Sequence, residues 1–220
     1  MQISSKMLRL VMCSLVALGG KLPAQMPGSP VLQNAFANPG ITAAGNVASL
    51  GGASSYALAA AWAPGAARFQ LSAGVGAQTR SGSPSRTIYG ARVNIPVLGG
   101  ASSFGASVFA GYGGLSGGKI DSSVAKTMIP AGATLSYRLG LGMVRGFSIY
   151  GSPIMEWVTR GGGAGNTSVF RGALGLDVGF TAAIGVTVGV ELGGKQPSES
   201  GKPSGTAFGA ALSYALGGRN

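Results

Sequence analysis

Apolar and polar residues alternate with a period of two through most of the chain beyond residue 40. In one segment, Phe69, Leu71, Ala73 and Val75 alternate with polar residues and glycine. Successive side chains of a β-strand point to opposite faces of a sheet, so this pattern predicts a strand with one apolar face. The same alternation marks the segments 86–97, 102–113, 128–139, 146–158, 169–180, 184–193 and 206–216. No segment has a sustained helical period, and the chain is therefore predicted to be all-β.

The connections between these segments alternate in length. Short links fall near Pro64–Ala67, Leu98–Ala101, Leu141–Arg145 and Ala182–Ile184, and longer ones at Arg80–Ser85, Leu115–Lys126, Arg160–Thr167 and Lys195–Ser204. This alternation indicates an up-and-down meander with short turns at one end and long loops at the other. If both termini lie at the short-turn end, a weakly patterned first strand is required near Ile41–Ser49, which makes ten strands. Eight strands is the alternative, and Pro153 predicts a bulge or kink.

The polar face of these strands consists mainly of Gly, Ser, Ala and Thr, which suits the interior of a narrow barrel better than a water-facing exterior. Thirteen of the 16 aromatic residues form two rows on the apolar face. The row at the short-turn end is Trp62, Phe69, Phe104, Tyr137, Phe147, Phe180 and Tyr214, and the row at the long-loop end is Tyr56, Tyr89, Tyr112, Trp157, Phe170 and Phe208. Two aromatic girdles are typical of membrane barrels. We therefore predict a closed antiparallel up-and-down transmembrane β-barrel, with a soluble barrel as the alternative.

Residues 1–24 have the features of a secretory signal peptide. Lys6 and Arg9 precede an apolar run that is too short for a transmembrane helix, and small residues follow, with a candidate cleavage site after Ala24. A retained N-terminal anchor is the alternative. Residues 25–40 form an extended, proline-rich leader or plug, and residues 41–220 form the barrel. We expect export to a bacterial outer membrane.

Composition excludes most enzyme chemistry. The 220-residue chain has no His, one Cys (Cys13) and five acidic residues, so it lacks the groups for His-based catalysis, a zinc site or a disulfide framework. We expect no enzyme activity, no cofactor and no metal. Gly161–Gly165 is no phosphate loop, because no Lys-Ser/Thr follows it. The net charge of +11 comes from scattered basic residues without a run, which argues against nucleic-acid binding.

Residues 41–216 resemble the small bacterial outer-membrane β-barrel proteins with eight to ten strands. The resemblance implies membrane lipid and the outer-membrane assembly machinery as partners, with a monomer as the default state. Such chains often end in an aromatic residue, whereas this one ends in Asn220, and Tyr214 would take that place. The stretch 34–40, NAFANPG, is similar to the N-terminal NPAG-type segment of the long-chain fatty acid transporter family. Enzymatic barrels of similar architecture use histidine, which is absent.

Charged residues on the polar face are the candidate functional residues. They are Arg68, Arg92, Arg138, Glu156, Arg171, Asp177 and Glu191. Their burial in a narrow lumen requires pairing, and Glu156 is expected to meet Arg171, with Glu191 as the rival partner. This network either fills a structural barrel or forms a mildly basic, porin-like constriction for small solutes, with a water path past Gly74, Gly76, Gly90, Gly105 and Gly132. The alternative is a hydrophobic-ligand barrel with a pocket lined by Ile88, Phe109, Tyr150 and Ile154 and plugged by the leader.

Overall fold

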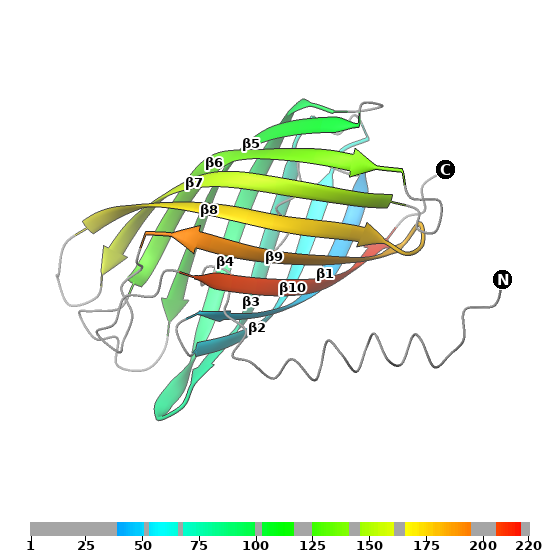
Figure 1. The fold of residues 1–220 in the computed structure, drawn as a ribbon. Coiled ribbons are helices and arrows are strands. Elements are labelled where there is room, and N and C mark those ends of the chain that lie inside the picture. Colours follow the sequence, from blue (N-terminus) through cyan, green and yellow to red (C-terminus); the bar gives the residue numbers. More distant parts are fainter. Residues whose placement is uncertain are drawn as a thin grey trace.

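A computed structural model describes residues 39–50, 53–65, 68–99, 103–116, 125–140, 146–160, 166–194 and 206–216. They form a closed antiparallel barrel in which each strand pairs with its neighbours in sequence and the first strand pairs with the last (Figure 1). The strands are β1 (Gly40–Leu50), β2 (Ala53–Ala63), β3 (Gln70–Arg80), β4 (Ser83–Leu98), β5 (Phe104–Ser116), β6 (Ala125–Leu139), β7 (Gly146–Arg160), β8 (Asn166–Gly179), β9 (Ile184–Gly193) and β10 (Ala207–Leu216). The predicted all-β barrel of ten strands is confirmed. The signal peptide and nearly all of the leader lie outside the described residues.

The weakly patterned first strand closes the barrel. β1 pairs with β10 from Ile41↔Leu216 to Leu50↔Ala207 and with β2 from Gly40↔Ala63 to Leu50↔Ala53. Its sequence, GITAAGNVASL, is poor in large side chains, so the two-residue alternation is faint. Backbone pairing on both sides does not depend on side-chain size, and the strand therefore forms despite its weak pattern.

The apolar face of the barrel is its exterior. Outward side chains include Leu58, Phe170 and Leu212, which are 73%, 62% and 60% exposed. The inward positions of β7 are buried and alternate with exposed ones along the strand. In Figure 1 the strands of the near wall cross those of the far wall at a steep angle, as tilted strands do when a sheet closes. The lumen is therefore the buried interior, and the exterior carries the large apolar groups.

The strand register shifts at three places, none of them at Pro153. The shifts lie between Gln78 and Arg80, between Pro96 and Leu98, and between Ala125 and Thr127. The predicted bulge at Pro153 is wrong, because β7 keeps one register with β8 through this residue. The missing proline N–H is accommodated by a local gap in the β6–β7 ladder, which has no residue pair between Gly132↔Ile154 and Leu135↔Gly151.

In the described ranges, no helix has the length and apolar character needed to cross a membrane.

Candidate functional site

The inner surface of the barrel differs between its two halves. β4 to β8 turn long side chains inward, among them Arg92, Phe109, Tyr150, Ile154 and Arg171, and these are at most 6% exposed. The inward positions of β9, β10, β1, β2 and β3 are mainly Gly, Ala, Ser and Thr. Alternating large and small residues is how the interior of a narrow barrel is filled. Most of the candidate polar groups described below therefore lie in a packed interior.

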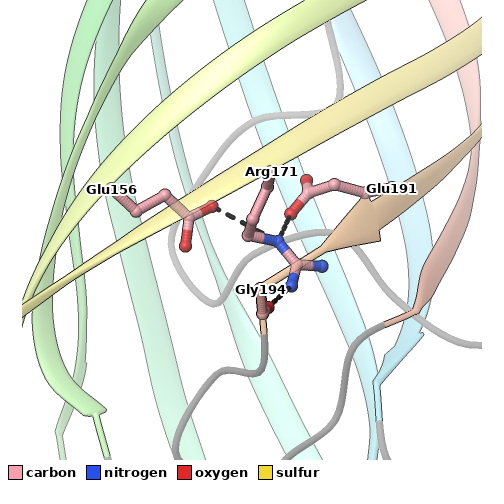
Figure 2. Close-up of polar contacts among 4 residues, drawn as sticks. All are labelled: Glu156, Arg171, Glu191 and Gly194. Atoms are coloured by element: carbon pink, nitrogen blue, oxygen red, sulfur yellow. Dashed lines mark hydrogen bonds and ion pairs between the residues drawn. The ribbon is translucent and has the colours of Figure 1, made fainter.

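Arg171 lies between two glutamates at the long-loop end of the lumen (Figure 2). Its Nε donates a hydrogen bond to Oε1 of Glu191 on β9, and the same Nε is 3.7 Å from Oε1 of Glu156 on β7. All three side chains are at most 3% exposed. The sequence predicted Glu156 as the partner and Glu191 as its rival, and the structure brings both to one guanidinium.

A backbone carbonyl completes this cluster. Nη1 of Arg171 donates to the carbonyl oxygen of Gly194 at 2.6 Å, just beyond the end of β9. Gly193 has a φ of 126°, and a Cβ atom there would lie 2.8 Å from the carbonyl oxygen of Phe170. Only glycine adopts this backbone with so close a neighbour, so Gly193 lets the chain turn Gly194 toward Arg171. The alternating sequence pattern gave no indication that the Gly194 carbonyl would accept a hydrogen bond from Arg171.

Among the described residues, the hydrogen-bond donors to Asp177 are hydroxyl groups. Oγ1 of Thr187 donates to its Oδ1 at 2.5 Å, and Oγ of Ser148 donates to its Oδ2 at 3.3 Å. The three residues come from β8, β9 and β7, which pair side by side. Hydrogen bonds to a charged acceptor are stronger than those between neutral groups, so two hydroxyls stabilise an ionised carboxylate here.

Arg92 has no carboxylate partner among the described residues. Its Cζ lies 3.6 Å from the centroid of the Phe109 ring, a cation–π contact between β4 and β5. Its Nε and Nη2 are buried and make no hydrogen bond in the described part of the chain. The residue is 4% exposed. A buried guanidinium with two free donors is energetically costly, which makes this the least satisfied charge described in the lumen.

The Tyr150 side chain extends from β7 over the neighbouring strand β8 to β9. A Cβ atom at Gly175 would lie 2.3 Å from the Tyr150 Cζ and hydroxyl oxygen, and one at Gly189 would lie 2.7 Å from that oxygen. The ring therefore occupies the space that side chains at these two glycines would fill. Its phenol is close enough to Arg92 and Asp177 to interact with both electrostatically. Tyr150 and Phe109 lie on inward positions of their strands. Their parity, which is their place in the two-residue alternation of inward and outward side chains, was the sequence signal for both.

The residues expected to line a hydrophobic pocket are packed together with other side chains. Phe109 and Ile154 form a buried cluster with Ala173, while Ile88 packs with Leu115 and Ala57. A third cluster, Met128, Val158 and Val169, fills the lumen near the long-loop end. Gly132, one of the glycines on the expected water path, lies beneath the Phe109 ring, whose Cζ would be 2.9 Å from a Cβ atom there.

Two of the predicted lumen arginines lie outside the buried network. Arg68 and Arg138 are solvent-exposed. β3 begins only at Gln70, so Arg68 belongs to the preceding connection, and Arg138 is the last residue but one of β6, where the barrel opens. The sequence assignment missed Arg86, which is inward-facing on β4 and 7% exposed. Its parity matches that of Arg92 and was the available signal.

The predicted girdle residues all lie on the exterior. Ten are well exposed, namely Tyr56, Trp62, Phe104, Tyr112, Tyr137, Trp157, Phe170, Phe180, Phe208 and Tyr214, and Phe69, Tyr89 and Phe147 are partly exposed. Trp62 and Phe69 pack edge to face with ring centroids 5.7 Å apart, and Tyr89 and Tyr112 lie 6.4 Å apart. Each row thus contains one pair of neighbouring aromatic rings that lie close together.

Within the described strands, no group of three or more His, Cys, Asp or Glu side chains is placed to hold a metal ion. The cluster of Glu156, Glu191 and Arg171 contains two carboxylates, but the guanidinium occupies the space between them.

No protein-family model matches this chain, and no curated protein matches its sequence. Three solved structures show a distant likeness. A bacterial polysaccharide outer membrane secretin has 9% identity and a TM-score of 0.46, and the match covers 75% of this chain and 57% of that protein, so this chain spans little over half of its length. The translocator domain of autotransporter NalP from Neisseria meningitidis has 12% identity and a TM-score of 0.46, with 82% of this chain and 90% of that one covered. LpxR from Salmonella typhimurium has 6% identity and a TM-score of 0.44, covering 74% and 73%.

Proposed function

We propose that this protein is a bacterial outer-membrane β-barrel with a closed lumen and a structural role, anchoring its long loops at one membrane surface. The observation that carries the proposal is the combination of an apolar exterior with a packed interior. It acts without a cofactor or catalysis, its partners are membrane lipid and the assembly machinery, and a signal peptide at residues 1–24 directs its export.

The exterior supports a lipid environment. Large apolar side chains such as Leu58, Val75 and Leu212 are more than half exposed and cover the outside of the barrel between the two aromatic rows. Soluble monomers rarely expose continuous apolar surfaces of this kind. A soluble barrel would carry its large apolar residues inside, whereas here they lie outside.

The spacing of the aromatic rows also fits a bilayer. Phe147 and Trp157 lie at opposite ends of the exterior of β7 and are ten residues apart. At about 3.3 Å per residue this is roughly 33 Å along the strand, which a typical tilt of about 45° reduces to roughly 23 Å of height. Transmembrane barrels carry an apolar band of about 25 Å between their girdles.

The interior supports a closed lumen over an open channel. Side chains lining a water-filled pore are accessible to water, yet Thr134, Glu156 and Ile154 are at most 1% exposed, and Phe109 and Tyr150 are at most 6% exposed. These residues come from the neighbouring strands β5, β6 and β7 and are packed inside the barrel. The narrow channel and the hydrophobic-ligand barrel therefore have less support than the structural role.

The test is single-channel recording of the refolded protein in a planar bilayer, with a heat-dependent gel shift to verify folding. The wild-type protein is expected to insert, to shift on heating and to give no discrete conductance steps. The variant Phe109→Ala with Tyr150→Ala removes both lumen-blocking rings and is expected to conduct. Leu58→Ala, on the lipid face, is the matched control and should stay silent. Discrete steps from the wild-type protein would overturn the closed lumen, and a folded protein that fails to enter lipid vesicles would overturn the membrane assignment.

A further inference from the structure

We propose that Arg92 binds a small carboxylate, or another small planar oxyanion, side-on inside the barrel. The inference goes beyond the structural role. It uses the closed lumen argued above, but its test measures anion binding and not conductance, so the two proposals can fail separately.

The two free donors of Arg92 belong to the same edge of its guanidinium. Nε–H and one N–H of Nη2 point in parallel directions, which is the fork that binds the two oxygens of a carboxylate at once. Both nitrogen atoms are buried and lack a hydrogen-bond partner in the described part of the chain. The Phe109 ring, 3.6 Å from Cζ, covers a face of the guanidinium and leaves this edge free. A ligand with two coplanar acceptors therefore fits the pattern of unmet donors.

Arg92 also makes no ion pair with a carboxylate among the described residues. The chain has five acidic side chains. Glu156 and Glu191 face Arg171, while Asp177 accepts hydrogen bonds from Thr187 and Ser148. Water molecules at the free edge would satisfy the donors but would leave a buried charge without a counter-ion, whereas an oxyanion satisfies both needs.

The surroundings limit the ligand to a small one. Gly111, opposite Arg92 on β5, lies in a narrow space, since a Cβ atom there would lie 2.9 Å from the carbonyl oxygen of Ala91 and 3.5 Å from Cβ of Arg92. Ser107, the next inward residue after Phe109 on β5, is 2% exposed, and its hydroxyl has no partner among the described residues. That hydroxyl is a further donor facing the same packed interior. A carboxylate with one or two carbon atoms suits such a space.

The experiment uses the mature chain refolded in detergent micelles, with folding verified by the heat-dependent gel shift. Sodium formate replaces sodium chloride at constant ionic strength and pH, and both the thermal midpoint and the saturation-transfer NMR signal of the formate proton are recorded. Wild-type protein is expected to show a saturable rise of the midpoint together with a transfer signal. An unchanged midpoint and no transfer signal would overturn the proposal and leave water as the occupant.

Three variants separate this site from general salt effects. Arg92→Met should weaken apparent formate binding at least about tenfold, and Arg92→Lys, which keeps the charge but lacks the fork, should weaken it nearly as much. Arg68→Met, at an exposed position, is the matched control and should bind like wild type. Equal formate responses in Arg92→Met and wild type would place the binding elsewhere and overturn the proposal, even if Arg92→Lys fails to fold.

Two further measurements identify the group that binds Arg92. Octanoate carries the same carboxylate on an acyl chain. Binding of formate indicates a small free anion as the occupant. Binding of octanoate but not formate would indicate a lipid-derived acid and would overturn the proposal of a small ligand.

Asp121 and Glu199, the remaining acidic residues, lie outside the described residues. Asp121→Asn and Glu199→Gln should leave formate binding unchanged. A large gain in formate binding in either variant would show that the chain's own carboxylate occupies Arg92, which would overturn the proposal.

Discussion

The two halves of the barrel wall solve the same packing problem in opposite ways. β4 to β8 contribute the long inward side chains, including Arg92, Phe109, Tyr150 and Arg171, while β9, β10 and β1 to β3 contribute mainly Gly, Ala and Ser. Small inward residues such as Ala59 and Ala211 are nevertheless only 6% and 3% exposed. The long side chains thus fill the lumen and bury the small ones, and the barrel is closed because its two halves differ.

The comparison predicts that loss of Arg171 has the largest effect. Arg171→Ala would remove the guanidinium that lies between the buried carboxylates of Glu156 and Glu191, and removal of one partner from a buried ion pair costs about 3–5 kcal/mol. We expect the urea midpoint of the folded, heat-modifiable form to fall accordingly. Recovery of stability when Glu156→Gln and Glu191→Gln are added would show that the uncompensated carboxylates, and not the lost packing, cause the effect. An Arg171→Ala variant as stable as wild type would contradict the buried cluster.

A side chain added at a glycine beneath one of the long inward side chains should collide with it. Gly175→Ala places a Cβ atom 2.3 Å from the Tyr150 ring, and overpacking of this kind costs about 1–3 kcal/mol. Tyr150→Ala should suppress the defect in a double-mutant cycle of unfolding free energies. The matched control is Gly45→Ala on the exterior of the barrel, where a Cβ atom meets nothing within 4 Å. Independent effects of Gly175→Ala and Tyr150→Ala would mean that the ring does not rest on this glycine.

The polar contacts around Asp177 predict a smaller and graded pair of effects. Thr187→Val removes the hydroxyl 2.5 Å from Asp177, and we expect a loss of about 1.5–2 kcal/mol, in the range of a hydrogen bond to a charged group. Ser148→Ala removes the longer contact of 3.3 Å and should cost less. Urea unfolding monitored by the gel shift measures both, and a reversed order would contradict the geometry around Asp177.

The strand number and orientation could be predicted from sequence because they depend on a two-residue period, which every inward or outward residue repeats. The weak strand β1 followed from counting connections, since an odd number of strands would have put the termini at opposite ends. The position of Arg171 between Glu156 and Glu191 was predictable only as a choice between partners, because parity gives the face of a residue but not its height in the tilted barrel. The Gly194 carbonyl, the Tyr150 ring over Gly175 and the unpaired fork of Arg92 depend on tilt and rotamers, for which parity carries no information.

The smallest predicted effect tests whether a residue on the inward face of the alternating pattern is also buried. Arg68 and Arg138 share the face assigned to Arg92 and Arg171 in the sequence, but the structure exposes both, Arg68 in the connection before β3 and Arg138 near the end of β6. Exposed substitutions usually change stability by less than about 0.5 kcal/mol, so Arg68→Ala and Arg138→Ala should leave the urea midpoint nearly unchanged. Running them beside Arg171→Ala keeps the residue type and the substitution constant and varies only the position. If either exposed arginine cost as much as Arg171, the buried network would extend to the barrel end, and the distinction between a packed lumen and its open rim would fail.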